Sequence, residues 1–298
     1  MNDLLTVNGL SKKLGRFALR DCSFTLPEGC ITGFIGANGA GKTTTLRTIL
    51  DLIHKDSGEV RFFGLDMAHN ASAIKDRIGV VLDGASFYDE LSLTEMKRVL
   101  APAYRQWSDD DFRRWLDRFQ LDPHQKIATL SRGMRMKYAL ALALSHNAEL
   151  LLMDEPTSGL DPRVRRQLLR ILSEFMGDGG KGVFFSTHIT SDLDQIADVL
   201  VMIDDGRIVF EADKDTLLDQ HPLIKGDRAT LTPDHRALFL SLEENAYGFN
   251  GLARSPEALD VFPDALVERP TIEDILLAYM KGDARHAASS RAQRFAHR

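Results

Sequence analysis

Short apolar runs alternate with segments of helical periodicity along most of the chain. Five runs of three to five mostly apolar residues have the length of buried strands, namely residues 31–35, 78–82, 150–153, 183–185 and 199–203. Between these runs, apolar residues recur three and four positions apart, as at Leu46, Ile49 and Ile53, which is the spacing of one helix face. Strands that alternate with helices predict an α/β fold with a mainly parallel sheet.

The pattern changes to successive helices after the second of these strands. Ser92-Leu93-Thr94-Glu95 has the S-x-x-E form of a capping box and begins one helix. Ser108 begins a second helix, and a third runs from Met134 to about Ser145. We therefore predict an inserted helical subdomain over about residues 84–147.

A glycine-rich loop joins the strand at 31–35 to the helix that follows it. This loop, from Gly36 to Thr44, fits the pattern G-x-x-x-x-G-K-[ST]. Glycines let backbone N–H groups turn toward phosphates, and the helix start adds partial positive charge there. We expect Lys42 to reach the β- and γ-phosphates and Thr43 to ligate Mg²⁺. The residues predicted to bind the nucleotide here are Gly36, Asn38, Gly39, Ala40, Gly41, Lys42, Thr43 and Thr44.

Polar residues also follow the strands at 150–153 and 183–185. Ligands of parallel sheets bind at the carboxyl ends of strands. We expect Asp154 to hold Mg²⁺, directly or through water, and Glu155 to act as general base on the attacking water. His188 can hydrogen-bond the γ-phosphate or that water. Glu155, His188 and Lys42 are therefore the predicted catalytic residues. The alternatives are a solvated pair of carboxylates and a structural histidine.

Charge and composition limit the classes of function. The formal net charge is −6, so the chain as a whole lacks the basic footprint of a nucleic-acid-binding protein. The two cysteines have neither metal-ligand nor redox spacing. No signal peptide is evident, and the longest apolar runs are far shorter than the ~18 residues of a spanning helix. If the protein works at a membrane, we expect another chain to span it.

The order of the motifs resembles the ATP-binding subunit of ABC transporters over roughly the first 215 residues. Residues 36–44 resemble the Walker A motif, and residues 130–134, Leu-Ser-Arg-Gly-Met, resemble the family signature. Residues 150–155 resemble Walker B with its catalytic glutamate. Residues 158–161 resemble the D-loop, and His188 resembles the switch histidine.

This resemblance implies a P-loop NTPase fold over residues 1–217, with an antiparallel β subdomain beside the helical subdomain that carries the signature. It implies ATP as ligand and Mg²⁺ as cofactor. Two such domains of this family form a head-to-tail sandwich, so the chain is expected to pair with a second ATP-binding subunit as a homodimer. Ser131 and the Gly133 backbone of one copy would then cap the γ-phosphate held by the other. Asp161 of the D-loop is also assigned to the nucleotide.

A narrower resemblance is to bacterial ATPases of exporters linked to drug and antimicrobial-peptide resistance. Asp83, Trp107-Ser108, residues 130–134 and residues 187–192 carry it. Such exporters have their membrane subunits as separate chains. The resemblance therefore implies a multi-spanning membrane permease as partner and a peripheral place on the cytoplasmic side of the cell membrane.

The segment from Asp83 to Gln106 corresponds to the part of these proteins that contacts the membrane subunit. Phe87 and Tyr88 are candidate contacts, and local packing of a loop is the alternative.

The chain departs from the family pattern at three places. Asp83 stands where a glutamine is expected. Its carboxylate can ligate Mg²⁺. The alternative is that Asp83 is a turn residue with no role in metal binding. Leu14 stands near the usual adenine-stacking aromatic, for which Phe17 is a substitute unless it serves only core packing. Arg132 and Met134 replace the first inner glycine and the final glutamine of the signature.

The motifs stop after Leu217. Residues 218–282 are predicted to form a small appended α+β unit, regulatory or bracing a dimer, in which residues 270–274 begin a helix. Residues 283–298 are predicted to be a disordered tail, with a basic membrane-touching segment as the alternative.

Two other functions compete with transport. A soluble ABC-family ATPase without a transport role is the first. A regulator that binds nucleotide without chemistry is the second, and the intact Lys42 and Glu155 disfavour it.

Overall fold

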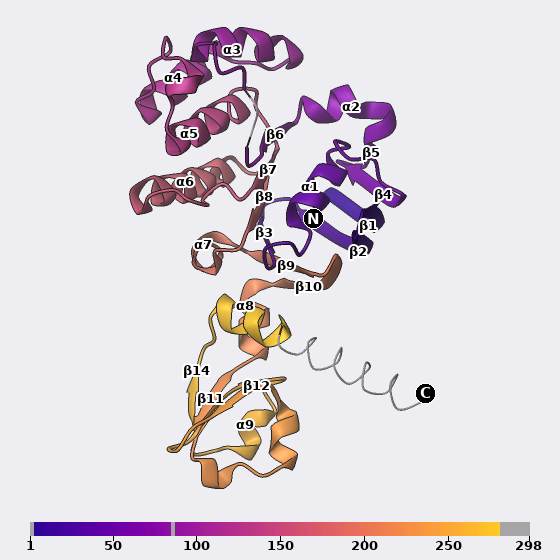
Figure 1. Cartoon of the computed structure of the whole chain (residues 1–298), viewed down its shortest axis with the longest axis vertical. Coiled ribbons are helices and arrows are strands. Elements are labelled where there is room, and N and C mark those ends of the chain that lie inside the picture. Colours follow the sequence, from indigo (N-terminus) through magenta and orange to yellow (C-terminus); the bar gives the residue numbers. More distant parts are fainter. Residues whose placement is uncertain (1–2, 85–86, 281–298) are drawn as a thin grey trace. The chain divides into compact units, whose positions relative to one another are not determined.

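The computed structural model describes residues 3–84 and 87–280 (Figure 1). The chain divides into two compact units. The first unit comprises the chain up to Asp192 together with Ile196–Glu211, and the second comprises Leu193–Gln195 and the chain from Ala212 onward. The domain limits predicted from the sequence remain predictions, and the predicted tail at 283–298 lies outside the described residues.

A six-stranded sheet is the framework of the first unit. Its strand order is β10 (Arg207–Asp213), β9 (Val199–Asp204), β3 (Ile31–Ile35), β8 (Gly182–Thr187), β7 (Leu150–Asp154) and β6 (Ile78–Val81). The ladders from β9 to β6 are all parallel, which confirms the predicted α/β fold. Every residue of β3, β7 and β8 is buried, as in strands that are covered on both faces.

A four-stranded antiparallel sheet packs against this framework. Its strand order is β2 (Phe17–Pro27), β1 (Asp3–Leu14), β4 (Ser57–Phe62) and β5 (Leu65–Asp66). Phe24 of β2 lies 5.7 Å from Phe34 of β3 and 5.6 Å from Phe184 of β8, measured between ring centroids. These aromatic contacts join the two sheets in one hydrophobic core.

The helices that precede β9 are α1 (Lys42–Ile49), α2 (Met67–Lys75), α3 (Leu93–Leu100), α4 (Asp109–Phe119), α5 (Arg132–Ala143), α6 (Pro162–Phe175) and α7 (Thr190–Ile196). In Figure 1, α3, α4 and α5 are grouped above the parallel sheet, and α6 lies beside it. Ser92 and Glu95 form the predicted capping box of α3, and Ser108 caps α4 by accepting a hydrogen bond from the backbone N–H of Asp111. In neither described stretch of the chain does a helix reach the length and apolarity needed to cross a membrane.

The second unit has a sheet and a core of its own. Its elements are α8 (Lys214–Gln220), β11 (Leu223–Gly226), β12 (Phe239–Glu244), β13 (Phe249–Ala253), α9 (Ala258–Val261), β14 (Leu266–Glu268) and a helix over residues 272–280. The strands form one sheet in the order β12-β13-β11-β14. The rings of Phe239, Phe249 and Phe262 pack together with centroids 5.6, 5.8 and 5.2 Å apart. The unit therefore has the predicted α+β character.

His146 is a fully buried titratable group between α5 and β6. Its Nδ1 lies 3.2 Å from the Leu142 carbonyl oxygen, and its Nε2 lies 3.0 Å from the Ile78 carbonyl oxygen. Its ring stacks on Tyr104 at 4.0 Å between centroids. Burial lowers the pKa of His146 below its ordinary value, although the two backbone contacts act in the opposite direction.

Because the His146 imidazole is buried, we expect the free energy of unfolding to fall when the pH is lowered. At pH 8, well above the ordinary histidine pKa of about 6.5, the ring is neutral in both the folded and the unfolded chain. Below that ordinary pKa, the unfolded chain takes up a proton that the folded chain resists, so the free energy of unfolding falls as pH falls toward the lowered pKa. Urea unfolding from pH 8 to 5.5 should show this slope, and His146→Gln should reduce it. The same substitution at the exposed His69 should leave the slope unchanged; equal slopes for wild type and both variants would contradict the assignment.

Candidate nucleotide site

At two positions of the phosphate loop, the backbone leaves room only for glycine. Gly41, just before α1, has φ of 119°, and a β-carbon there would lie 2.8 Å from Cζ of Phe17. A β-carbon on Gly36 would lie 2.4 Å from the carbonyl oxygen of Ile203. The loop therefore follows β3 closely and delivers the start of α1, at Lys42, to the carboxyl edge of the sheet.

The Lys42 side chain is almost fully buried beneath this loop. Its Nζ donates hydrogen bonds to the carbonyl oxygens of Gly36 at 2.8 Å and Ala37 at 3.3 Å. It also lies 3.1 Å from Oε1 of Glu155. The side chains of the two partners are only 5% and 13% exposed, so the ion pair is largely withdrawn from water.

Glu155 links Lys42 to the end of β8. Its backbone is left-handed, with φ of 48°, and its N–H bonds the backbone oxygen of Ser186 at 3.0 Å. Its second carboxylate oxygen, Oε2, lies 2.7 Å from Nδ1 of His188. One carboxylate therefore contacts both the phosphate-loop lysine and the histidine after β8.

Asp154 occupies the last position of β7 and is 1% exposed. The hydroxyl of Ser186 on the neighbouring strand donates to its Oδ1 at 2.7 Å. The same hydroxyl accepts a hydrogen bond from the Glu155 N–H at 3.1 Å. Ser186 was not among the predicted site residues. Its place between an apolar run and His188 is the signal that indicates it.

A cavity of about 600 Å³ opens at this edge of the sheet. Its walls contain most of the phosphate loop, the catalytic candidates and two residues near the first hairpin. The lining residues are Leu14, Phe17, Asn38, Gly39, Gly41, Lys42, Thr43, Thr44, Asp83, Glu155, Ser158 and His188. Side chains that are more than 140 residues apart in sequence thus meet around one space.

Three predicted nucleotide-binding residues outside the phosphate loop lie away from the cavity, and Gly36 and Ala40 within the loop do not line it either. Ser131 is exposed and caps α5 by accepting a hydrogen bond from the Met134 N–H at 3.2 Å. Gly133 follows in the first turn of that helix. Asp161 caps α6 by accepting hydrogen bonds from two backbone N–H groups, at 3.0 and 3.1 Å. None of the three lines the cavity of its own chain.

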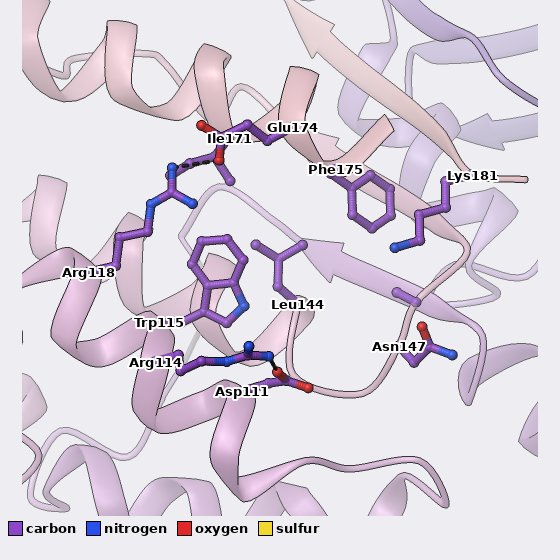
Figure 2. A pocket seen from close by; sticks show the side chains of 11 residues that line it. Asp111, Arg114, Trp115, Arg118, Leu144, Asn147, Ile171, Glu174, Phe175 and Lys181 are labelled. Carbon is purple, nitrogen blue, oxygen red and sulfur yellow. Dashed lines mark hydrogen bonds and ion pairs between the residues drawn. The ribbon is translucent and has the colours of Figure 1, made fainter. Parts of the chain in front are cut away.

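A second cavity, of about 590 Å³, lies between α4, α6 and the turn after α5 (Figure 2). Figure 2 shows the ring of Trp115 and the side chains of Leu144 and Phe175 around it. On its rim Arg118 pairs with Glu174 at 2.6 Å. No candidate site residue is among the described residues that line this cavity, so it is distinct from the phosphate-loop cavity.

Known proteins with similar sequences identify the family. The family profile described as "ABC transporter" matches residues 19–158, which include the phosphate loop, residues 130–134 and Glu155. The bacitracin transport ATP-binding protein BcrA of Enterococcus faecalis is 30% identical over 214 residues, which is 71% of this chain and 70% of that protein. This chain belongs to the ABC transporter ATP-binding proteins.

Two further similarities extend this result. The fluoroquinolones export ATP-binding protein MT2762 of Mycobacterium tuberculosis (strain CDC 1551 / Oshkosh) is 31% identical over 271 residues, covering 89% of this chain and 88% of that protein. A solved structure of the ATP-binding subunit of an ABC transporter is 29% identical with a TM-score of 0.66, covering 72% of this chain and 91% of that chain. The predicted family and P-loop NTPase fold are confirmed, and the ABC ATP-binding chain is an ATPase subunit.

In this ABC ATP-binding chain, Ser186→Ala should lower the free energy of unfolding by about 1–3 kcal/mol, because a buried carboxylate loses its hydrogen-bond donor. Urea unfolding at neutral pH measures the change. Ser173→Ala is the control, since the Ser173 hydroxyl donates to the Leu169 carbonyl oxygen within α6 and contacts no carboxylate among the described residues; a loss within about 0.5 kcal/mol is expected there. Equal losses in the two variants would show that the Ser186–Asp154 contact has no special weight.

Proposed function

We propose that two copies of this chain dimerise on Mg-ATP, hydrolyse the ATP and so power a separate membrane-spanning exporter of drugs or antimicrobial peptides. The observation that carries the proposal is the placement of Glu155. Its carboxylate contacts Lys42 with one oxygen and His188 with the other, at a cavity lined by the phosphate loop. Hydrolysis of a γ-phosphate uses a residue that orients or deprotonates the attacking water, and a carboxylate at this cavity can act in that way.

Nucleotide binding would exchange one partner of Lys42 for another. The γ-phosphate carries negative charge, so it can replace Glu155 at the Lys42 ammonium group, which then stabilises charge on the phosphate oxygens. Glu155 is released to accept the proton of an attacking water. His188, already 2.7 Å from Glu155, orients that water or hydrogen-bonds the γ-phosphate.

The oxygen donors around the cavity fit a magnesium ion. Mg²⁺ prefers hard oxygen ligands and commonly keeps only one or two from the protein beside the phosphates. Thr43 and Asp83 line the cavity, whereas Asp154 does not line it and is buried at the end of β7, where its Oδ1 accepts a hydrogen bond from Ser186. We assign Thr43, Asp154 and Asp83 as the residues that hold the ion. Once bound, Mg²⁺ neutralises charge on the phosphates.

The base of the nucleotide is assigned to the first hairpin. Leu14 is 39% exposed and lines the same cavity as Phe17. An apolar side chain and an aromatic ring offer a stacking surface to adenine. The cavity therefore has apolar side chains in its wall beside the phosphate loop.

The signature is assigned to the nucleotide of a second copy. Ser131, Gly133 and Asp161 lie outside the cavity of their own chain, while Ser131 and Asp161 are exposed. These residues resemble nucleotide-binding motifs but do not line the cavity of their own chain. In a head-to-tail homodimer they would contact the nucleotide held by the other copy. The partner's phosphates would meet Ser131 and the Gly133 backbone.

A groove between the helical subdomain and the end of β6 is the proposed permease contact. It has a volume of about 270 Å³ and an apolar lining that includes Leu82, Phe87 and Trp107. Tyr88 next to it is 63% exposed. An amphipathic helix of a multi-spanning permease is the partner that such a groove would accept. The chain would then be peripheral on the cytoplasmic side of the cell membrane, and the net charge of −6 supports a partner other than nucleic acid.

The proposed domain limits follow the motifs. Residues 1–217 are assigned as the ABC ATP-binding domain, with the helical subdomain at about 84–147. Residues 218–282 are assigned as the appended unit, which in the described range folds around Phe239, Phe249 and Phe262.

The base assignment predicts that Glu155→Gln will lower ATP turnover by at least about 100-fold, because an amide cannot accept the proton of the water. The variant should still form a dimer on ATP, which size-exclusion chromatography detects. Glu149→Gln is the matched control. Glu149 directly precedes β7, and its carboxylate pairs with Arg77 at 2.6 Å and does not line the cavity. Turnover retained by Glu155→Gln would refute the assignment.

The permease assignment predicts that the chain purifies from membranes with a multi-spanning protein, and that Tyr88→Asp lowers the recovery of that protein. The ATPase activity of the isolated chain should stay unchanged, because Tyr88 does not line the nucleotide cavity. Leu52→Asp is the control, since Leu52 is 60% exposed but follows α1. A chain that purifies without any membrane protein would favour an ABC-family ATPase with no transport role.

A further inference from the structure

Arg132 of the signature contacts two other loops of the same chain. It is the first residue of α5, and its Nη2 lies 3.3 Å from Oδ1 of Asp83, which follows β6. Its guanidinium also lies against Gly159, where an added β-carbon would be 2.8 Å from Nη1 and where φ is 67°. A larger residue at 159 would therefore strike the arginine and be strained in its backbone.

Both contacted loops reach the nucleotide cavity. Asp83 lines it, and so does Ser158, the neighbour of Gly159. Arg132 and Asp83 are also two of the positions where the chain departs from the ABC motif pattern. The structure brings these departures into contact with each other, although they are 49 residues apart.

The pair is too exposed to be explained by stability. The Arg132 and Asp83 side chains are 55% and 54% exposed, and such ion pairs contribute little to folding. The planar guanidinium nevertheless lies between the Asp83 carboxylate, to which it donates one hydrogen bond, and the turn at Gly159, against which it packs. Its effect should therefore appear in the geometry of the cavity.

We propose that Arg132 is a positioning residue for ATP hydrolysis: through Asp83 and Gly159 it ties the signature loop to the two loops that line the phosphate cavity of its own chain. The proposal rests on the hydrolytic function proposed above. Arg132 acts in cis, through Asp83, and Asp83 presents its carboxylate to the cavity from the position that Arg132 sets.

The test is a mutant cycle in the full-length chain, with kcat and KM for ATP measured for Arg132→Ala, Asp83→Ala and the double variant. Misplacing the loops should lower kcat by about tenfold or more in Arg132→Ala. The KM for ATP, which depends on the phosphate loop, should stay within about twofold of wild type. Because the residues act as one pair, the double variant should be no slower than Asp83→Ala alone.

Two further variants give readouts that a merely structural role would not move. Arg132→Lys, which keeps a positive charge opposite the Asp83 carboxylate, should retain more of the wild-type kcat than Arg132→Ala. Gly159→Ala, which displaces the guanidinium, should repeat the kcat loss of Arg132→Ala. Arg135→Ala is the matched control, because Arg135 lies one turn further along α5 and pairs with Asp89 at 2.7 Å, outside the nucleotide cavity; it should keep wild-type kcat.

Several results would overturn the proposal. Wild-type kcat in Arg132→Ala would exclude a positioning role. Additive losses for Arg132 and Asp83, or a loss of ATP-driven dimerisation confined to Arg132→Ala, would assign Arg132 to the nucleotide of the partner copy instead. Glu155→Gln in the same assay separates the two proposals. If Glu155→Gln keeps its ATP turnover, the hydrolytic assignment is refuted. If Glu155→Gln is inactive but Arg132→Ala has wild-type kcat, only the positioning role of Arg132 is refuted.

Discussion

The ion pair between Lys42 and Glu155 is the interaction on which the nucleotide site depends. Both side chains are nearly buried, and a buried charge left without its partner is costly by several kcal/mol. Lys42 also donates to the carbonyl oxygens of Gly36 and Ala37, and Glu155 also contacts His188, so each residue keeps polar partners when the pair separates. In the proposed mechanism, phosphate oxygens of ATP take the place of the Glu155 carboxylate at the Lys42 ammonium group.

The parallel sheet is what brings this pair together. The order β3-β8-β7 places the phosphate loop, His188 and Asp154 at the ends of adjacent strands. Ser186 then links two of these strands through hydrogen bonds to Asp154 and Glu155. The parallel pairing of β3, β8 and β7 and the hydroxyl of Ser186 thus fix the positions of Asp154 and Glu155. Glycine at positions 36 and 41 leaves room for the loop that covers Lys42.

Local patterns in the sequence were sufficient for the features that depend on local structure. The buried strands and the phosphate loop were predictable because their apolar runs and glycines determine conformation within a few residues. The helix α2 was not predicted, because only Met67 and Ile74 are buried in it and Asn70 departs from helical backbone angles. The pairing of Arg132 with Asp83 could not be predicted from local patterns either, since it depends on how α5 packs beside β6. The functional roles of the site residues remain predictions.

The affinity of the chain for ADP tests the central interaction most directly. ADP avoids turnover and does not supply the γ-phosphate that the proposed dimer needs. If the Glu155 carboxylate pairs with Lys42 before nucleotide binds, ADP must break that ion pair. Glu155→Gln should then bind ADP more tightly than wild type, by roughly three- to tenfold, or about 0.7–1.4 kcal/mol. Calorimetric titration of both proteins, with Glu149→Gln as control, measures the difference. An affinity equal to or weaker than that of wild type would contradict the view that nucleotide must displace Glu155 from Lys42.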